Sequence, residues 1–261
     1  MKTYKLTEYK IRSLPQNALK ASKNIDQPSH DAIQNFITIN SSSPNLERDS
    51  IRFTSERICS QCSKCLSPNK PPMGIPPVLG KGNVEAKLML VGEAPGEWEI
   101  LKKEPFIGPA GQELNQALKF HKLDRDKDLY ISNAIKCRPT RYSEFDSTKL
   151  VGRKPSGDEL ANCKSFISAE IEIVSPEVII LLGQSAYEQV TSQPIGSHFT
   201  PLVGSEDLLN YKSWDGTDRS AILLTTWHPS YILRKETKKE QNEIRKDIDK
   251  TIKRAKEILG I

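Results

Sequence analysis

The sequence predicts an α/β fold in which a parallel β-sheet is covered by helices on both faces. Four short runs of the chain are apolar throughout, which is typical of strands buried on both faces. These runs are separated by stretches with helical periodicity. Strands that alternate with helices in this way pair in parallel through crossover connections.

The expected strands are the apolar runs at residues 88–91, 129–131, 178–182 and 221–224. The expected helices cover residues 111–120, 156–174, 184–190 and 238–259. Ser156 followed by Glu159 forms a capping-box pattern, which marks the beginning of the second helix. The last helix has an apolar stripe and a charged opposite face, so we expect it to dock on the core.

Size and composition indicate one folded domain with an extension. The chain has 261 residues, and we expect a polar N-terminal extension over residues 1–50 and the domain over residues 51–261. A net charge of +5 favours DNA or another polyanion only mildly. No apolar run reaches the roughly 20 residues that span a bilayer, and a secretory signal is not visible. We therefore expect a cytoplasmic protein with reduced cysteines and no membrane partner.

Three polar residues come directly after expected strands: Glu93, Asn133 and His228. In open α/β sheets, ligands bind beyond the carboxyl ends of the parallel strands. The order of these residues along the chain therefore predicts one pocket that contains all three at the rim of the sheet.

The five cysteines indicate a metal centre. Cys59, Cys62 and Cys65 form two overlapping C-x-x-C pairs, and Cys137 and Cys163 lie further along the chain. Four thiolates complete a tetrahedral zinc site or a cubane iron–sulfur cluster. Zinc sites usually close with a second tight pair, whereas Cys137 and Cys163 are 26 residues apart. The spacing therefore favours a cluster and leaves zinc open, with one cysteine surplus to four ligands.

Five segments of the chain form a series in a fixed order. They are GEAPGEWE at 92–99, EPFIGPAG at 104–111, YISNAIKCRP at 130–139, VIILLG at 178–183 and TWHPSYILR at 226–234. With Cys163 between the third and fourth, this series closely resembles the family 4 uracil-DNA glycosylases, which carry a four-iron, four-sulfur cluster. The similarity covers about residues 58–235.

The resemblance implies a three-layer α/β/α sandwich with a four-stranded, mainly parallel sheet. It implies hydrolysis of the N-glycosidic bond of a flipped pyrimidine in DNA, most simply uracil, which leaves an abasic site for base excision repair. It also implies a structural 4Fe-4S cluster. The ligands by this resemblance are Cys62, Cys65, Cys137 and Cys163, with Cys59 as the alternative to Cys65.

The same resemblance assigns roles to individual residues. Phe106 matches the aromatic residue that stacks on the base, Asn133 the amide that reads its edge, and His228 the histidine that faces the pyrimidine carbonyl. Glu93 and Glu99 match acidic positions of the first motif. The remaining expected contacts are Gly92 and Ala94 beside the base, and Lys136, Arg138, Ser230, Tyr231 and Arg234 on the DNA.

The chemistry of these residue types agrees with the assignment. A base must leave the duplex stack before its glycosidic bond can be cut. An Asn amide offers an acceptor and two donors, which suits the carbonyl and ring N–H of uracil but not the reversed edge of cytosine. A histidine donor stabilises the leaving base anion, and a carboxylate stabilises the sugar cation or orients water. The sequence does not divide this work between Glu93 and Glu99.

Several positions depart from the family pattern. Ile100 stands where an acid is usual, Lys103 where Gly is frequent, Trp98 adds a bulky ring, and residues 141–154 carry an insertion. These departures motivate one alternative, a glycosylase that excises a bulkier modified base from phage DNA. A non-catalytic iron–sulfur DNA-binding module is a further alternative, although no catalytic position is missing. We expect a monomer, because the site needs no partner subunit to be complete.

Overall fold

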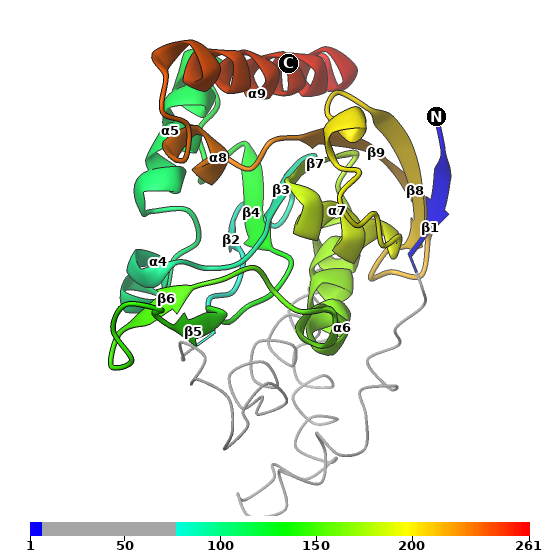
Figure 1. Ribbon diagram of the computed structural model, residues 1–261. Helices are drawn as coiled ribbons and strands as arrows, with labels where there is room; N and C mark the ends of the chain where they lie inside the picture. Colours follow the sequence, from blue (N-terminus) through cyan, green and yellow to red (C-terminus); the bar gives the residue numbers. More distant parts are fainter. Residues whose placement is uncertain (7–76) are drawn as a thin grey trace, which may run out of the picture.

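The computed structural model describes residues 1–6 and 77–261 (Figure 1). In this part of the chain, one sheet contains seven strands in the order β1-β8-β9-β7-β3-β4-β2. The four central strands are parallel to their neighbours within this group. They are β9 (Asp218–Thr226), β7 (Val178–Leu182), β3 (Leu88–Gly92) and β4 (Leu129–Asn133). These are the four strands that the apolar runs predict.

The sheet is wider than the four strands implied by the family resemblance, so that number is wrong. β8 (Glu206–Lys212) pairs antiparallel with β9, β1 (Thr3–Lys5) pairs parallel with β8, and β2 (Lys81–Gly82) pairs antiparallel with β4. None of the three has a long continuous apolar run. β8 alternates buried and partly exposed residues, and the other two are only two or three residues long. The first residues of the expected polar extension thus form an edge of the sheet.

Helices cover both faces of the sheet, which confirms the three-layer α/β/α architecture (Figure 1). One face carries α6 (Gly157–Val174) and α7 (Gln184–Thr191), and the other carries α5 (Pro109–Phe120) and α9 (Lys238–Leu259). Successive strand residues point to opposite faces of a sheet. In β3, Met89 and Val91 therefore pack in the first core, and Leu88 and Leu90 pack in the second.

The α6 helix begins where its sequence signal places it, whereas α5 begins at Pro109, two residues before the expected position. Ser156 Oγ accepts a hydrogen bond from the Glu159 amide, and the Glu159 carboxylate accepts one from the Ser156 amide, so the capping box of α6 is confirmed. Two short helices, α4 (Glu97–Lys102) and α8 (Ser230–Leu233), complete the helices near the rim of the sheet, and of these α8 was not predicted. No helix in the described ranges is long and apolar enough to cross a membrane.

The insertion over residues 141–154 forms most of a hairpin that stands apart from the main sheet. Its strands are β5 (Thr140–Tyr142) and β6 (Leu150–Gly152). Arg153 anchors it by a two-pronged ion pair with Glu159 at the start of α6, with N–O distances of 2.6 and 2.7 Å.

Candidate active site

The carboxyl ends of the central strands bring four predicted site residues together. Gly92 ends β3 and Asn133 ends β4, and the two residues are paired across these strands. His228 follows β9, and Phe106 lies in the loop between α4 and α5. The ring centroids of Phe106 and His228 are 5.6 Å apart. The predicted convergence at one rim of the sheet is therefore observed for Asn133 and His228, whereas Glu93, the third residue of that prediction, has its side-chain hydrogen bond with Ser185 of α7.

Gly92 permits this close assembly. A Cβ atom at this position would lie 2.3 Å from Phe106 Cζ and 2.5 Å from Asn133 Oδ1. Both distances are far inside van der Waals contact, so a side chain here would displace the ring or the amide. The strand must end in glycine for the aromatic ring and the amide to meet over it.

Asn133 presents a buried hydrogen-bond acceptor. The residue is only 2% exposed, and its Oδ1 has no hydrogen-bond partner among the described residues. Leaving a buried polar atom unpaired destabilises a protein by about 1–3 kcal/mol. Such atoms are rare in folded proteins and call for an explanation, of which a ligand that supplies the missing donor is one.

His228 presents a buried donor. Its Nδ1 accepts a hydrogen bond from the Ser230 amide at 3.2 Å and lies 2.8 Å from Ser230 Oγ. An amide only donates, so Nδ1 is unprotonated and the neutral ring carries its proton on Nε2. Nε2 is buried and has no partner in the described part of the chain. Burial, with a smaller contribution from the charge of Arg234, lowers the pKa of His228 to about 4.

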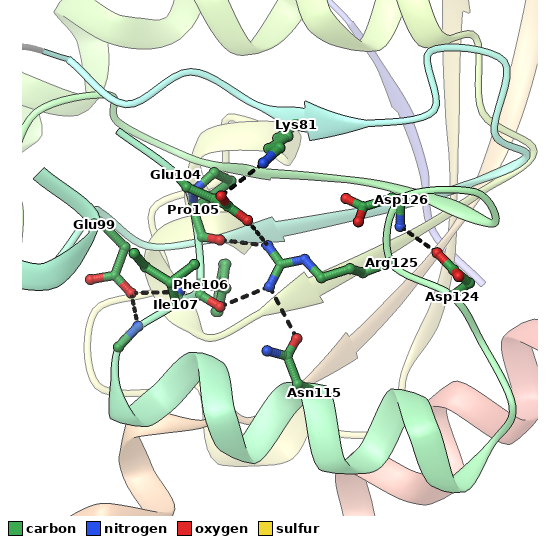
Figure 2. A network of polar contacts seen from close by, with 11 residues as sticks. Lys81, Glu99, Glu104, Pro105, Phe106, Ile107, Asn115, Asp124, Arg125 and Asp126 are labelled. Atoms are coloured by element: carbon green, nitrogen blue, oxygen red, sulfur yellow. Dashed lines mark hydrogen bonds and ion pairs between the residues drawn. The ribbon is translucent and has the colours of Figure 1, made fainter. Parts of the chain in front are cut away.

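Glu99 is turned toward the backbone of its own loop. Its Oε1 accepts hydrogen bonds from the amides of Ile107 and Gly108 at 3.0 and 2.8 Å (Figure 2). Its Oε2 accepts one from the Gly96 amide at 3.1 Å. The residue is buried. These contacts make Glu99 a residue that shapes the loop carrying Phe106, rather than a carboxylate that faces the rim.

Glu93 differs from Glu99 in exposure and in contacts. It follows β3 directly and is partly exposed, and its Oε2 accepts a hydrogen bond from the buried Ser185 Oγ at 2.7 Å. A carboxylate with one oriented oxygen retains further acceptor capacity for water. Its neighbour Ala94 packs against the small hydrophobic cluster that contains Cys163.

Lys136 does not lie on the surface, and the prediction that it contacts DNA is wrong. The residue has no solvent-exposed area. Its Nζ donates to Ser132 Oγ at 2.7 Å, to the Asn133 carbonyl at 2.9 Å and to Glu170 Oε2 at 2.6 Å. A lysine ammonium has three protons, so all of its donors are used. Lys136 thus fixes the backbone of Asn133 through its buried carbonyl group.

Two other residues expected on DNA make contacts within the protein. Arg138 Nη2 lies 3.4 Å from Glu97 Oε2, and its side chain is 20% exposed. Ser230 is the partner of His228 Nδ1, so in this structure it orients the imidazole.

An aromatic and basic stack lies beside His228. The rings of Trp227 and Tyr231 are stacked with centroids 4.8 Å apart. Arg234 Cζ lies 5.5 Å and Lys235 Nζ 4.8 Å from the centroid of the Tyr231 ring. Two cations held at one aromatic ring next to the rim suit a phosphate backbone. Lys235 was not singled out in the sequence.

Only two of the five cysteines lie within the described residues. Cys137 and Cys163 pack in the same small cluster with Ile135 and Phe166, so the structure brings these two thiols to one place. Cys59, Cys62 and Cys65 lie outside the described residues. The described chain resumes at residue 77, and the Val78 amide donates to the Lys136 carbonyl at 2.7 Å, next to Cys137.

The described residues contain no group of three or more side chains able to hold a metal ion. Cys137 and Cys163 fit one half of a four-thiolate site, because a cubane cluster takes four cysteines.

Besides Lys235, sequence reasoning missed three residues that support the site: Arg125, Glu170 and Ser185. None belongs to a recognisable motif. Glu170 had one signal, because it is a carboxylate within a predicted helix beside apolar Ile171. An acid on a buried helix face indicates a buried partner, which here is Lys136.

Two residues that depart from the family pattern, Lys103 and Trp98, lie on or at the end of α4. Lys103 caps α4 in the left-handed conformation, with a φ of 55°. A glycine adopts this conformation without strain, which accounts for the preference for Gly at this position in the pattern. Trp98 is 56% exposed, so its ring is available on the surface of α4.

Comparisons with known proteins identify the family of the chain. A family model described as the uracil DNA glycosylase superfamily matches residues 79–251. The type-4 uracil-DNA glycosylase of Thermotoga maritima is 34% identical over 182 residues, which cover 70% of this chain and 82% of that protein. The type-4 uracil-DNA glycosylase of Sulfurisphaera tokodaii is 31% identical over 189 residues, covering 71% and 76%. The chain therefore belongs to the uracil-DNA glycosylase superfamily.

Proposed function

We propose that the protein is a monofunctional DNA glycosylase that removes uracil and leaves an abasic site for base excision repair. One observation carries the proposal. Asn133 Oδ1 is a buried acceptor and His228 Nε2 a buried donor, and neither has a partner among the described residues. The names of the type-4 relatives support the same activity.

Base recognition follows from the polarity of these two atoms. Asn133 Oδ1 accepts a proton donor, which uracil offers at its N3–H, whereas N3 of cytosine is itself an acceptor. Stacking on Phe106 contributes about 1–3 kcal/mol, by analogy with bases on aromatic side chains in single-strand binding. This offsets the few kcal/mol needed to flip the base out of the duplex. Both polar atoms are buried in the protein, so their hydrogen bonds to a base would be shielded from water.

Bond cleavage needs a hydrogen-bond donor on the base side of the glycosidic bond and a proton acceptor for the attacking water on the sugar side. As the C1′–N1 bond breaks, its electron pair leaves with the base, and His228 Nε2–H donates to the base oxygen that gains negative charge. A water oxygen forms the new bond to C1′, and its proton passes to Glu93. Glu99 does not take part directly, because its oxygens hold the loop amides.

We further propose that Cys137 and Cys163, with two of the cysteines at positions 59, 62 and 65, hold a 4Fe-4S cluster. The packing of Cys137 and Cys163 in one small group of hydrophobic side chains supports this. When bound, such a cluster supplies a rigid cross-link between chain segments. Arg138, Tyr231 and Arg234 are the proposed contacts to DNA, and a cytoplasmic monomer with residues 51–261 as its catalytic domain remains the expectation.

Excision from oligonucleotides tests the proposal. The purified protein should cleave uracil-containing DNA to alkali-labile abasic sites. His228→Ala should lower the single-turnover rate by about 100- to 1,000-fold, the effect of losing one preorganised donor. Asn133→Ala, which removes the acceptor for the N3–H of uracil, should lower it by a similar factor. Asn242→Ala, at an exposed position of α9, is the matched control. Intact uracil DNA that the protein nevertheless binds would refute the uracil assignment, and base release from hypermodified phage DNA would favour the bulkier substrate.

Two carboxamide variants divide the work of the acids. Glu93→Gln should abolish most excision with little loss of stability. Glu99→Gln should lower stability by about 1–3 kcal/mol, because its NH₂ group would face the Gly96 amide donor. The reverse pattern would assign the water-activating role to Glu99.

A further inference from the structure

The loop that carries Phe106 is held in an unfavourable backbone conformation. Phe106 has a φ of 55°, in the left-handed region. A bulky side chain rarely adopts this region, and it persists only where the surroundings determine it. The residues that enforce this conformation therefore decide where the aromatic ring points.

Arg125 holds the carbonyl side of this loop. Its Nη2 donates to the Pro105 carbonyl at 2.7 Å, and its Nη1 donates to the Phe106 carbonyl at 3.0 Å (Figure 2). Nη1 also donates to Asn115 Oδ1 of α5 at 3.1 Å, which ties the guanidinium to a rigid helix. The Arg125 side chain is 18% exposed, so these bonds are largely shielded from water.

Glu99 holds the amide side of the same loop, through Ile107 and Gly108. Four consecutive residues, 105–108, thus have two carbonyls bound by a cation and two amides bound by an anion (Figure 2). Glu104 joins the arrangement, since its carboxylate lies 3.8 Å from Arg125 and 2.7 Å from Lys81. We call the side chains of Arg125 and Glu99 the loop clamp.

Gly111 brings the loop close to α5. A Cβ atom there would lie 2.0 Å from the Phe106 carbonyl oxygen, so the helix meets the loop at a point where only glycine fits. This contact places the carbonyl within reach of Arg125, which also binds α5 through Asn115.

We propose that Arg125 is a positioning residue for base stacking, acting through Phe106. This inference rests on the proposed glycosylase function. The hydrogen bonds of Arg125 go to loop backbone and to Asn115, so it acts on the base only through the orientation of the ring. Its fork geometry suits two neighbouring carbonyls, and the single point charge of lysine reproduces that fork only in part.

A double-mutant cycle tests the proposal. Arg125→Gln should lower single-turnover excision of uracil by about 10- to 100-fold, the effect of a misplaced binding group. In a Phe106→Ala background the same change should lower excision less than about 3-fold, because the ring through which it acts is gone. Arg125→Lys should recover part of the activity. Equal losses in both backgrounds would overturn the proposal.

Arg245→Gln is the matched control, because Arg245 makes a two-pronged ion pair with Glu113, at 2.8 and 2.9 Å, between α9 and α5. It should change thermal stability without changing excision. Hydrogen exchange of the amides at 107 and 108, measured without DNA, should become faster in Arg125→Gln. That readout stands even if the wild-type protein leaves uracil intact, and unchanged exchange would refute the clamp independently of the activity.

Discussion

Replacing Lys136 by methionine tests the buried network beneath Asn133. Lys136 has no exposed area, and it pairs with Glu170, which is 8% exposed. Removing the lysine leaves the buried Glu170 carboxylate without its cation, and only Ser132 Oγ and the Gly80 amide still donate to it. Breaking a buried pair in this way destabilises a protein by about 3–5 kcal/mol. For a domain of this size, that loss lowers the melting temperature by roughly 6–20 °C.

Guanidinium denaturation measures the loss, and two companion variants interpret it. Lys149→Met, at an exposed lysine, should change the free energy of unfolding by less than about 0.5 kcal/mol. Lys136→Met combined with Glu170→Met should regain most of the stability, because both charges are then absent. Excision should be low in the single variant and also in the double variant, since in both the Asn133 carbonyl has lost its donor.

The opposite result is equally clear. If Lys136→Met keeps wild-type stability but loses affinity for DNA in a salt-dependent manner, the lysine contacts phosphate and the buried network is incorrect. Such a variant would reduce the salt dependence of binding by about one phosphate contact.

Two further predictions concern the rim. The pKa of His228 is lowered to about 4 from 6.5, so the imidazole should stay neutral down to about pH 4. In a pH–rate profile of single-turnover excision, activity should therefore fall with a midpoint near pH 4 as the pH is lowered. A midpoint near pH 6.5 would contradict the buried environment. In the unfolded state the same histidine binds its proton below about pH 6.5, so its contribution makes unfolding easier as pH falls from 6.5 to 4. Gly92→Ala should fold but lose excision by about 100-fold or more through a displaced ring or amide; unchanged kinetics would show that the contact over Gly92 is unimportant.

The sequence predicted those elements whose burial is encoded locally. The four central strands are apolar on both faces, and the long helices carry an apolar stripe or a cap, so each has a pattern of its own. β8 escaped notice because only alternate residues are buried. The convergence of Asn133 and His228 was predictable because parallel strands end at one rim.

The chemistry of individual side chains was less predictable, since it depends on distant partners. Lys136 stands beside Arg138 in a stretch that suggests a basic surface, but its environment is set by Glu170, 34 residues away. Glu99 and Glu93 lie in one motif, and only the fold shows that Glu99 accepts from loop amides whereas Glu93 accepts from Ser185 Oγ. Arg125 acts on Phe106 across 19 residues, with no pattern that joins them.

The two outermost strands of the sheet, β1 and β2, also carry a consequence for folding. They are successive in the described chain but lie six strand steps apart, so the segment between Lys5 and Lys81 must bridge roughly 29 Å of sheet. β1 docks through contacts such as Lys2 to Asp207, across 205 residues of chain. Contacts of such long range form late, and until then the backbone of β8 is an open edge that can pair with another molecule. Loss of β1 should therefore promote aggregation during synthesis more than it impairs the finished site.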